Sequence, residues 1–101
     1  ARHGNFLTKN GRKNIHRAEY KFSEKPLEDG CICYTCGQFN QSYLRHLMIE
    51  NEILGHRLMT IHNLHFLLDL MRQLRHHIEK GTLKSFASSF ISSYNASKEE
   101  L

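Results

Sequence analysis

The sequence predicts a small β-hairpin region followed by helices, with a metal site where the two parts meet. In the first 22 residues, short apolar segments flank an Asn-Gly dipeptide, a pattern typical of a β-hairpin. From about residue 40, apolar residues recur at intervals of three and four, which is typical of helices. Cys31, Cys33 and Cys36 lie between the two parts. At 101 residues the chain is at most one small domain, in which a bound metal adds useful stability.

The first expected element is a hairpin of short strands. The dipeptide Asn10-Gly11 lies between segments 5–8 and 14–16, and it readily adopts the positive φ angles of a type I′ turn. A third strand is expected at Tyr20 and Phe22, which alternate with charged neighbours. This region contains too few apolar side chains to fold by itself.

The hairpin region, residues 1–30, is basic. Residues 1–25 hold seven basic and two acidic side chains, a net charge of +5, whereas the remaining 76 residues have a net charge of −1. A basic segment of this density suits the phosphate backbone of a nucleic acid. It equally suits a solvated hairpin with lysines on its edge. Charge alone does not decide between the two.

The cluster Cys31-x-Cys33-x2-Cys36 together with His62 predicts a zinc site. Thiolate and imidazole are preferred ligands of structural zinc, and three sulfurs with one nitrogen complete its tetrahedral shell. A complete shell leaves no position for water or substrate, so one Zn²⁺ per chain is expected to hold structure and perform no chemistry. His65, one turn beyond His62, is the alternative fourth ligand and is otherwise a surface or pocket histidine.

The rival interpretations of the cysteines are a disulfide and a redox-active thiol pair. A secreted scaffold of this size normally has an even number of cysteines, and this chain has three. Cys33 and Cys36 have the spacing of a redox pair, but no βαβ pattern surrounds them. No signal-like run opens the chain, and no run of about 20 apolar residues is present. We therefore expect a cytoplasmic protein without membrane contact, whose thiols stay reduced.

Helices are expected after the cysteines. Asn40 or Ser42 is suited to cap the first of them. A longer helix is expected over residues 52–80, ending at Gly81, which tolerates the left-handed conformation. Gly55 costs about 1 kcal/mol inside this helix relative to alanine, unless a close helix contact needs its small size.

The last segment, residues 81–101, is expected to form a short helix that opens at Thr82 and a frayed tail from Ser97. The long helix before it is too apolar for a protein of this size. Its apolar side chains cover more than one stripe, as in a helix contacted on two sides. Either a partner chain or a missing part of the same domain should cover them. They are Leu64, Phe66, Leu67, Leu68, Leu70 and Met71.

Several short motifs follow one another along residues 1–94. They are Arg2-His3-Gly4-Asn5-Phe6-Leu7-Thr8, Pro26-Leu27, the cysteine cluster, Tyr43-Leu44-x-His46-Leu47, Glu52-x-Leu54-Gly55 and His62-Asn63-Leu64. In this order, the motifs resemble the C-terminal part of tRNA-guanine transglycosylases.

The resemblance implies an α/β parent fold, a (β/α)8 barrel with a zinc-binding subdomain inserted near its C-terminal end. Residues 31–62 would form that subdomain, and residues 52–80 would form the last barrel helix. Members of the family exchange the wobble guanine of certain tRNAs for a 7-deazaguanine, on the way to queuosine. An aspartate attacks the ribose C1′ and forms a covalent intermediate with the RNA. The implied partners are therefore tRNA and a 7-deazaguanine base.

The catalytic centre of that family is expected outside this chain. The family's nucleophile lies a few residues before an Arg-x-x-Arg-x-Gly run, and this chain begins at the second arginine of that run. Asp29 and Asp69, the only aspartates, do not have this context. We therefore expect a C-terminal fragment with no catalytic residue of its own, inactive in isolation.

The resemblance assigns the three cysteines and His62 as zinc ligands and places Arg2 near the tRNA-binding surface. Phe39, Tyr43 and His46 fall at i, i+4 and i+7 and form one stripe on the first helix. The stripe is either part of the core or a contact of the homodimer that the family forms through its zinc subdomain. Leu58 is a possible neighbour across that contact.

A second class of function stays open at this point. A free-standing zinc module that binds RNA or a protein partner would also explain the basic segment and the closed metal site. This alternative needs no barrel and no catalytic residue.

Overall fold

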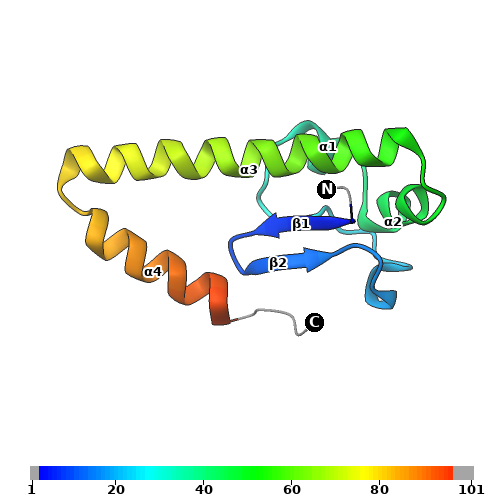
Figure 1. Ribbon diagram of the computed structural model, residues 1–101, viewed down its shortest axis with the longest axis horizontal. Helices are drawn as coiled ribbons and strands as arrows, with labels where there is room; N and C mark the ends of the chain where they lie inside the picture. Colours follow the sequence, from blue (N-terminus) through cyan, green and yellow to red (C-terminus); the bar gives the residue numbers. More distant parts are fainter. Residues whose placement is uncertain (1–2, 97–101) are drawn as a thin grey trace.

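The computed structural model describes residues 3–96, so Arg2 and the tail from Ser97 lie outside the described residues. A two-stranded hairpin lies beside a long helix, and the last helix folds back toward the hairpin (Figure 1). The prediction of a β-hairpin followed by helices is confirmed. The elements are β1 (Asn5–Thr8), β2 (Gly11–Asn14), a 3-10 helix η1 (Ala18–Tyr20), α1 (Tyr34–Gln38), α2 (Gln41–Ile49), α3 (Ile53–Lys80) and α4 (Leu83–Ala96).

The hairpin turn differs from the predicted one. Thr8 pairs with Gly11, so the corner residues are Lys9 and Asn10, and neither has a positive φ. Gly11 instead has a φ of 118°. Thr8 stabilises this turn, because its hydroxyl donates to Gly11 O at 2.7 Å and accepts from Asn10 N at 3.2 Å. The predicted type I′ turn is therefore wrong, and β2 begins three residues earlier than expected.

The predicted third strand is also wrong. Tyr20 ends η1, and Phe22 lies in a turn with 83% of its surface exposed. Local hydrogen bonds favour this tight coil, since Tyr20 N donates to Arg17 O and Ser23 N donates to Tyr20 O, both at 3.2 Å. Tyr20 is nevertheless buried, because its ring packs edge-on against Phe6 with 5.7 Å between the centroids.

The helix ends follow the predicted signals. The Asn40 side chain accepts a hydrogen bond from Tyr43 N at 2.8 Å and caps α2. Gly55 allows α3 to approach α2 closely, because a Cβ atom there would lie 2.8 Å from Leu47 Cβ. Gly81 ends α3 in the left-handed conformation, with a φ of 72°. The predicted end at Gly81 is confirmed, the cap is Asn40 and not Ser42, and for Gly55 the close helix contact is the alternative that holds.

The core lies between the hairpin, α2 and the first part of α3. Beyond His62, no described side chain of α3 or α4 is buried. Leu64, Leu68 and Met71 are 51–55% exposed, so the predicted apolar excess is uncovered in this chain. None of the helices within residues 3–96 is long and apolar enough to cross a membrane. The core residues are Phe6, Ile15, Tyr20, Leu27, Leu44, Leu47, Met48, Leu58 and Met59.

Candidate metal centre

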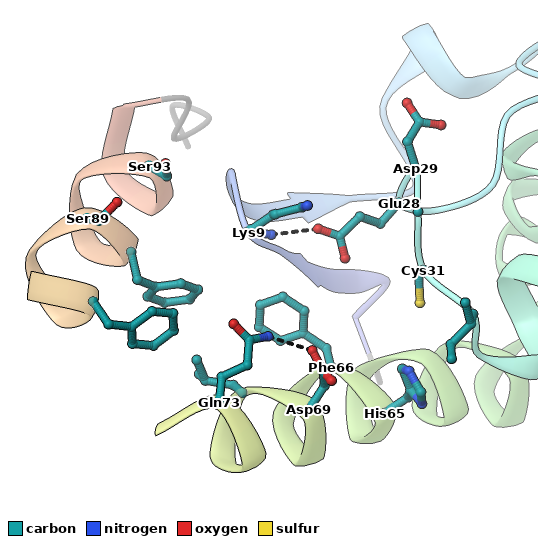
Figure 2. A pocket seen from close by; sticks show the side chains of 15 residues that line it. Lys9, Glu28, Asp29, Cys31, His65, Phe66, Asp69, Gln73, Ser89 and Ser93 are labelled. Carbon is teal, nitrogen blue, oxygen red and sulfur yellow. Dashed lines mark hydrogen bonds between the residues drawn. The ribbon is translucent and has the colours of Figure 1, made fainter. Parts of the chain in front are cut away.

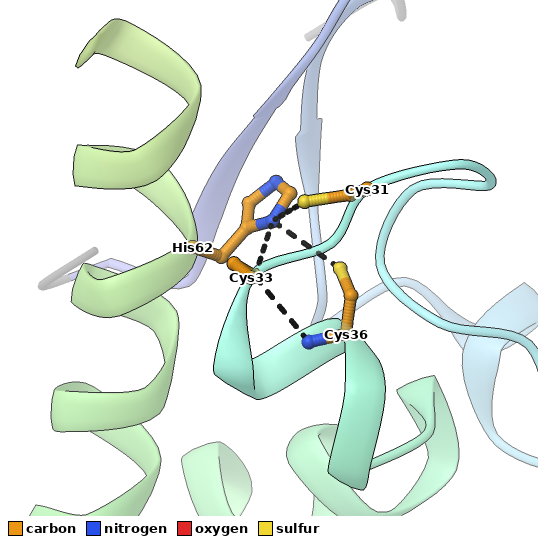
Figure 3. A group of neighbouring side chains, drawn as sticks. All are labelled: Cys31, Cys33, Cys36 and His62. Carbon is orange, nitrogen blue, oxygen red and sulfur yellow. Dashed lines mark hydrogen bonds between the residues drawn. The ribbon is translucent and has the colours of Figure 1, made fainter. Parts of the chain in front are cut away.

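Three cysteines from one loop face a single histidine on α3 (Figure 3). Cys31 precedes α1, Cys33 caps it and Cys36 lies within it. The Nδ1 atom of His62 is 3.6 Å from the sulfurs of Cys31 and Cys33 and 3.4 Å from that of Cys36. All four donor atoms lie within 4.8 Å of one another, so the predicted ligand set is brought together.

The hydrogen bonding of the His62 ring identifies its tautomer. Nε2 lies 2.8 Å from Leu7 O, and a carbonyl oxygen only accepts, so Nε2 holds the proton. Nδ1 therefore has a free lone pair directed at the three sulfurs. One lone pair cannot satisfy three thiol donors. A metal cation at the centre of the group satisfies all four atoms together.

The spacing of the donor atoms fits tetrahedral zinc. Zn–S and Zn–N bonds of about 2.3 and 2.05 Å at a tetrahedral angle place sulfur and nitrogen about 3.6 Å apart. The three observed separations, 3.4–3.6 Å, are close to this value. These sulfur–nitrogen separations are compatible with a four-coordinate ion of this size held by these ligands.

The electrostatics of the site also favour a cation. Burial raises the pKa of the Cys31 and Cys36 thiols, and the neighbouring Cys33 sulfur adds to the effect. Burial lowers the pKa of His62, so its ring is kept neutral. Three thiolates this close together are unfavourable without a compensating positive charge. A divalent cation supplies that charge and converts all three thiols to their ligating form.

Two further hydrogen bonds hold the cysteine loop in place. Cys36 N donates to Cys33 Sγ at 3.4 Å, so Cys33 both caps α1 and faces the metal position. Thr35 is fully buried and its hydroxyl donates to Leu58 O at 2.5 Å, which ties α1 to α3. The five-residue helix α1 was not predicted, since five residues contain too few apolar positions to show a helical period.

Asn63 was not among the predicted site residues, although it lies in the motif His62-Asn63-Leu64. Its Oδ1 accepts from Leu7 N at 2.9 Å, and its Nδ2 donates to Asn5 O at 3.0 Å. Together with the bond from His62 to Leu7 O, these contacts join α3 to the free edge of β1. The place of Asn63 in that motif did not indicate these contacts with β1.

The other candidate residues lie away from the metal position. His65 is not in the metal-ligand group and instead lines a hollow of about 420 Å³ between α3, α4 and the cysteine loop (Figure 2). Phe39 stacks on Tyr43 with 5.4 Å between the centroids, and Tyr43 is 42% exposed. His46 is exposed beside them. Leu58 is 2% exposed and belongs to the core, so it contributes nothing to the surface of this stripe.

The fold and the site together define a small module in which a three-cysteine, one-histidine metal centre joins a β-hairpin to a long helix. The chain belongs to the family described as queuine tRNA-ribosyltransferase, whose sequence profile matches residues 1–96. Membership of the family agrees with the resemblance noted in the sequence.

Several curated relatives bear the same name, queuine tRNA-ribosyltransferase. The protein of Dictyoglomus turgidum is 49% identical over 94 residues, which are 93% of this chain and 24% of the relative. The protein of Thermosipho africanus is 47% identical over 94 residues, 93% of this chain and 26% of the relative. That of Moorella thermoacetica is 45% identical over 98 residues, 97% and 26% of the two proteins. The chain thus spans about a quarter of the length of these relatives.

Proposed function

We propose that this chain is the C-terminal, zinc-binding portion of a tRNA-guanine transglycosylase. The intact enzyme exchanges the wobble guanine of tRNA for a 7-deazaguanine in queuosine synthesis. The observation that supports this most strongly is the family match over residues 1–96 by a chain that spans only a quarter of its relatives. Its partners would be tRNA and the 7-deazaguanine base, and its location the cytoplasm.

The metal in this proposal is zinc, one ion per chain, held by Cys31, Cys33, Cys36 and His62. Zinc would supply structure and no chemistry, because four protein ligands complete its shell. The chain's own residues prepare the site. They hold Nε2 of His62 protonated against Leu7 O and collect three sulfurs on the opposite side of the ring.

In the intact enzyme, α3 would be the last helix of a (β/α)8 barrel. The support for this is the uncovered apolar surface on its outer part, where Leu64, Leu68 and Met71 are more than half exposed. Contiguous apolar surface of this kind usually marks a contact with another part of a protein. The remainder of the barrel would supply that cover.

A homodimer contact is proposed at the stripe formed by Phe39, Tyr43 and His46. Stacked aromatic rings at a surface are favourable anchors for a protein contact, and Tyr43 is both stacked and exposed. In the intact enzyme, Tyr43→Ala combined with Phe39→Ala should weaken the dimer, as measured by light scattering. A dimer of unchanged stability would rule out this surface.

Contact with tRNA is proposed for Arg2 and the basic hairpin region. The support is the net charge of +5 over residues 1–25, which suits a phosphate backbone. In the intact enzyme, Arg2→Ala should weaken tRNA binding and reduce its dependence on salt. Salt dependence identical to that of the unaltered enzyme would remove Arg2 from the interface.

The exchange assay tests the central proposal. The measurement is incorporation of a labelled 7-deazaguanine into tRNA, with this chain and a full-length enzyme compared side by side. The full-length enzyme should exchange the base, and this chain alone should not, because neither Asp29, which precedes Cys31, nor Asp69 on α3 has the sequence context of the family's nucleophile. Turnover by the purified chain would contradict the proposal and direct attention to Asp29 and Asp69.

The alternative is a free-standing zinc module that binds RNA or a protein. The basic segment favours it, and fluorescence anisotropy with a labelled tRNA anticodon stem-loop tests it. Micromolar binding by this chain alone, with the exchange assay negative for every longer form of the protein, would support the alternative.

A further inference from the structure

Within residues 3–96, no third strand pairs with the outward edge of β1. In an antiparallel pair, alternate residues direct both backbone groups toward the partner strand, and the residues between them direct both groups away. Gly4 O faces β2, since it accepts from Ile15 N at 2.9 Å. Asn5 and Leu7 therefore expose their carbonyl and amide groups on the opposite side. Such groups are costly if they are left unsatisfied where water is excluded.

Two adjacent side chains of α3 fill the place of the missing strand. His62 Nε2 donates to Leu7 O at 2.8 Å, Asn63 Oδ1 accepts from Leu7 N at 2.9 Å, and Asn63 Nδ2 donates to Asn5 O at 3.0 Å. The pattern of donor, acceptor and donor matches what an added strand would present. Two side chains of α3 thus make the hydrogen bonds to the edge of β1 that the backbone of a third strand would otherwise make.

His62 belongs to this edge and to the metal centre at once. Its Nδ1 faces the three sulfurs, and its Nε2 holds Leu7 O. The orientation of the ring therefore depends on the position of Leu7 O. That carbonyl belongs to the residue whose amide is held by Asn63. Asn63 lies outside the ligand group. It nevertheless holds the backbone of Leu7, and the Leu7 carbonyl in turn orients the ligand His62.

We infer that Asn63 is a positioning residue of the metal centre, which acts on the metal through β1 and His62. Removal of its amide should weaken metal binding, because His62 loses the fixed acceptor that orients it and increases its basicity. The effect must be reciprocal, since two coupled events change each other's free energy by the same amount. Metal binding should therefore also order the outward edge of β1.

The first test measures metal affinity at pH 7 by Co²⁺ titration in competition with a chelator. Asn63→Ala should bind Co²⁺ about tenfold to a hundredfold more weakly than the unaltered chain, the usual effect of losing a partner that orients a ligand. Gln73→Ala is the matched control, because Gln73 is an exposed amide on the same helix that bonds only to Asp69 among the described residues. It should change affinity less than twofold. Asn63→Asp keeps the acceptor for Leu7 N but not the donor to Asn5 O, and should fall between the two.

A purely structural role for Asn63 is separated by two local signals. In the unaltered chain, zinc should slow hydrogen exchange of the Leu7 amide more than that of Phe6, which faces β2. Asn63→Ala should also shift the ¹⁵N resonance of His62 Nε2 in the zinc-loaded chain.

Three results would overturn the inference. The first is Co²⁺ affinity within twofold of the unaltered value in Asn63→Ala. The second is a ¹⁵N resonance of His62 Nε2 that does not change between zinc-loaded Asn63→Ala and the zinc-loaded unaltered chain. The third is Leu7 exchange that does not respond to zinc, which needs no variant and so remains informative even if Asn63→Ala fails to fold. None of these outcomes depends on RNA or on base exchange.

Discussion

Residues 4–62, the inner part of this chain, and residues 63–95, the outer part, contain similar fractions of apolar residues but differ in what they bury. Every buried residue described lies between Gly4 and His62. From Asn63 to Asn95, no described side chain is buried, although that stretch contains many leucines and phenylalanines. One continuous helix, α3, runs through both parts (Figure 1). Apolar composition alone therefore does not determine which residues form a core.

The difference comes from what faces each part of α3. The inner part has the hairpin on one side, α2 on another and the cysteine loop across its end. The outer part has only α4, which contacts it through ring pairs such as Phe66 and Phe90, whose centroids are 6.5 Å apart. His77 stacks on Phe86 at 4.3 Å and lies 2.7 Å from Thr82 Oγ1, which fixes the elbow between the helices. The inner part of α3 is thus packed against several elements, whereas most side chains of the outer part are exposed or only half-buried.

Loss of the metal should have the largest effect on stability, and this effect should be confined to the inner part. Cys36→Ala and His62→Ala should each abolish stoichiometric zinc and lower the melting temperature of the core more than any other substitution, because structural zinc contributes roughly 10–16 kcal/mol of binding free energy in small modules. Elemental analysis and thermal melting followed by circular dichroism measure both. His65→Ala, one turn further along α3, is the control and should retain one zinc. Undiminished zinc in both ligand variants would refute the assignment.

Acid should remove the stabilisation that zinc provides. Zinc displaces up to three thiol protons, so its apparent affinity should fall by up to about a thousandfold per pH unit below the thiol pKa values. The metal-free chain should behave differently. The raised pKa of Cys31 and Cys36 makes its stability fall above about pH 8.5, and the lowered pKa of His62 makes it fall below about pH 6.5.

Melting curves from pH 5 to 9, with zinc and with a chelator, test this expectation. The gain in melting temperature from zinc should grow steadily with pH. A gain that is constant over this range would exclude thiolate ligation.

Two methionines on α3 allow the two parts to be compared directly. Met59 is fully buried and Met71 is 55% exposed. Met59→Ala should cost about 2–5 kcal/mol of unfolding free energy through the cavity it leaves. Met71→Ala should change it by less than about 0.5 kcal/mol. Urea denaturation of the zinc-loaded chain measures both, and similar costs would show that the outer part is packed after all.

Two glycines provide a smaller contrast within the inner part. Gly55→Ala should lose roughly 1 kcal/mol, since overpacking against Leu47 costs about 1–3 kcal/mol and the gain in helix propensity returns about 1 kcal/mol. Gly37 in α1 has nothing within 4 Å of its Cβ position, so Gly37→Ala should gain up to about 1 kcal/mol. A stabilising Gly55→Ala would mean that the contact between α2 and α3 is looser than described.

Substitutions of exposed apolar residues in the outer part should have the smallest effect on stability. Their effect on self-association should be large. We expect the isolated chain to self-associate through its uncovered apolar surface. Leu64→Glu combined with Leu68→Lys replaces two side chains that are more than half exposed with a favourable i, i+4 ion pair. Light scattering should show less association, with the melting temperature nearly unchanged. A chain that is already monomeric at high concentration would contradict the expectation.

Features determined by neighbouring residues were predictable from the sequence. Asn40 caps α2 and Gly81 ends α3 because each acts within one turn of its own position. The four metal ligands were predictable because few residue types bind zinc and the cysteine spacing is short. In both cases the chemistry is local or restricted to specific residue types.

Features that depend on distant contacts were not predictable. The segment around Tyr20 has a strand-like alternation, but the pocket beside Phe6 is filled by a ring from a 3-10 turn. Asn63 lies in the motif His62-Asn63-Leu64, but nothing in the sequence indicates its partners, which are backbone groups 56 and 58 positions away. Every residue type has a backbone carbonyl, and all but proline have an amide N–H, so a hydrogen bond to the backbone does not require a particular residue at the partner position.

The hydrogen bond between Leu7 and Asn63 joins residues 56 positions apart. During synthesis, β1 is therefore made well before the side chain that pairs with its edge. At about 5–20 residues per second, β1 is made roughly 3–11 s before the side chains that complete its edge. An open strand edge during that interval is prone to pair with other chains. The net charge of +5 over residues 1–25 opposes such pairing by repulsion. The basic segment that suits RNA in the folded protein would thus also limit aggregation of the nascent chain through β1 until α3 has been synthesised.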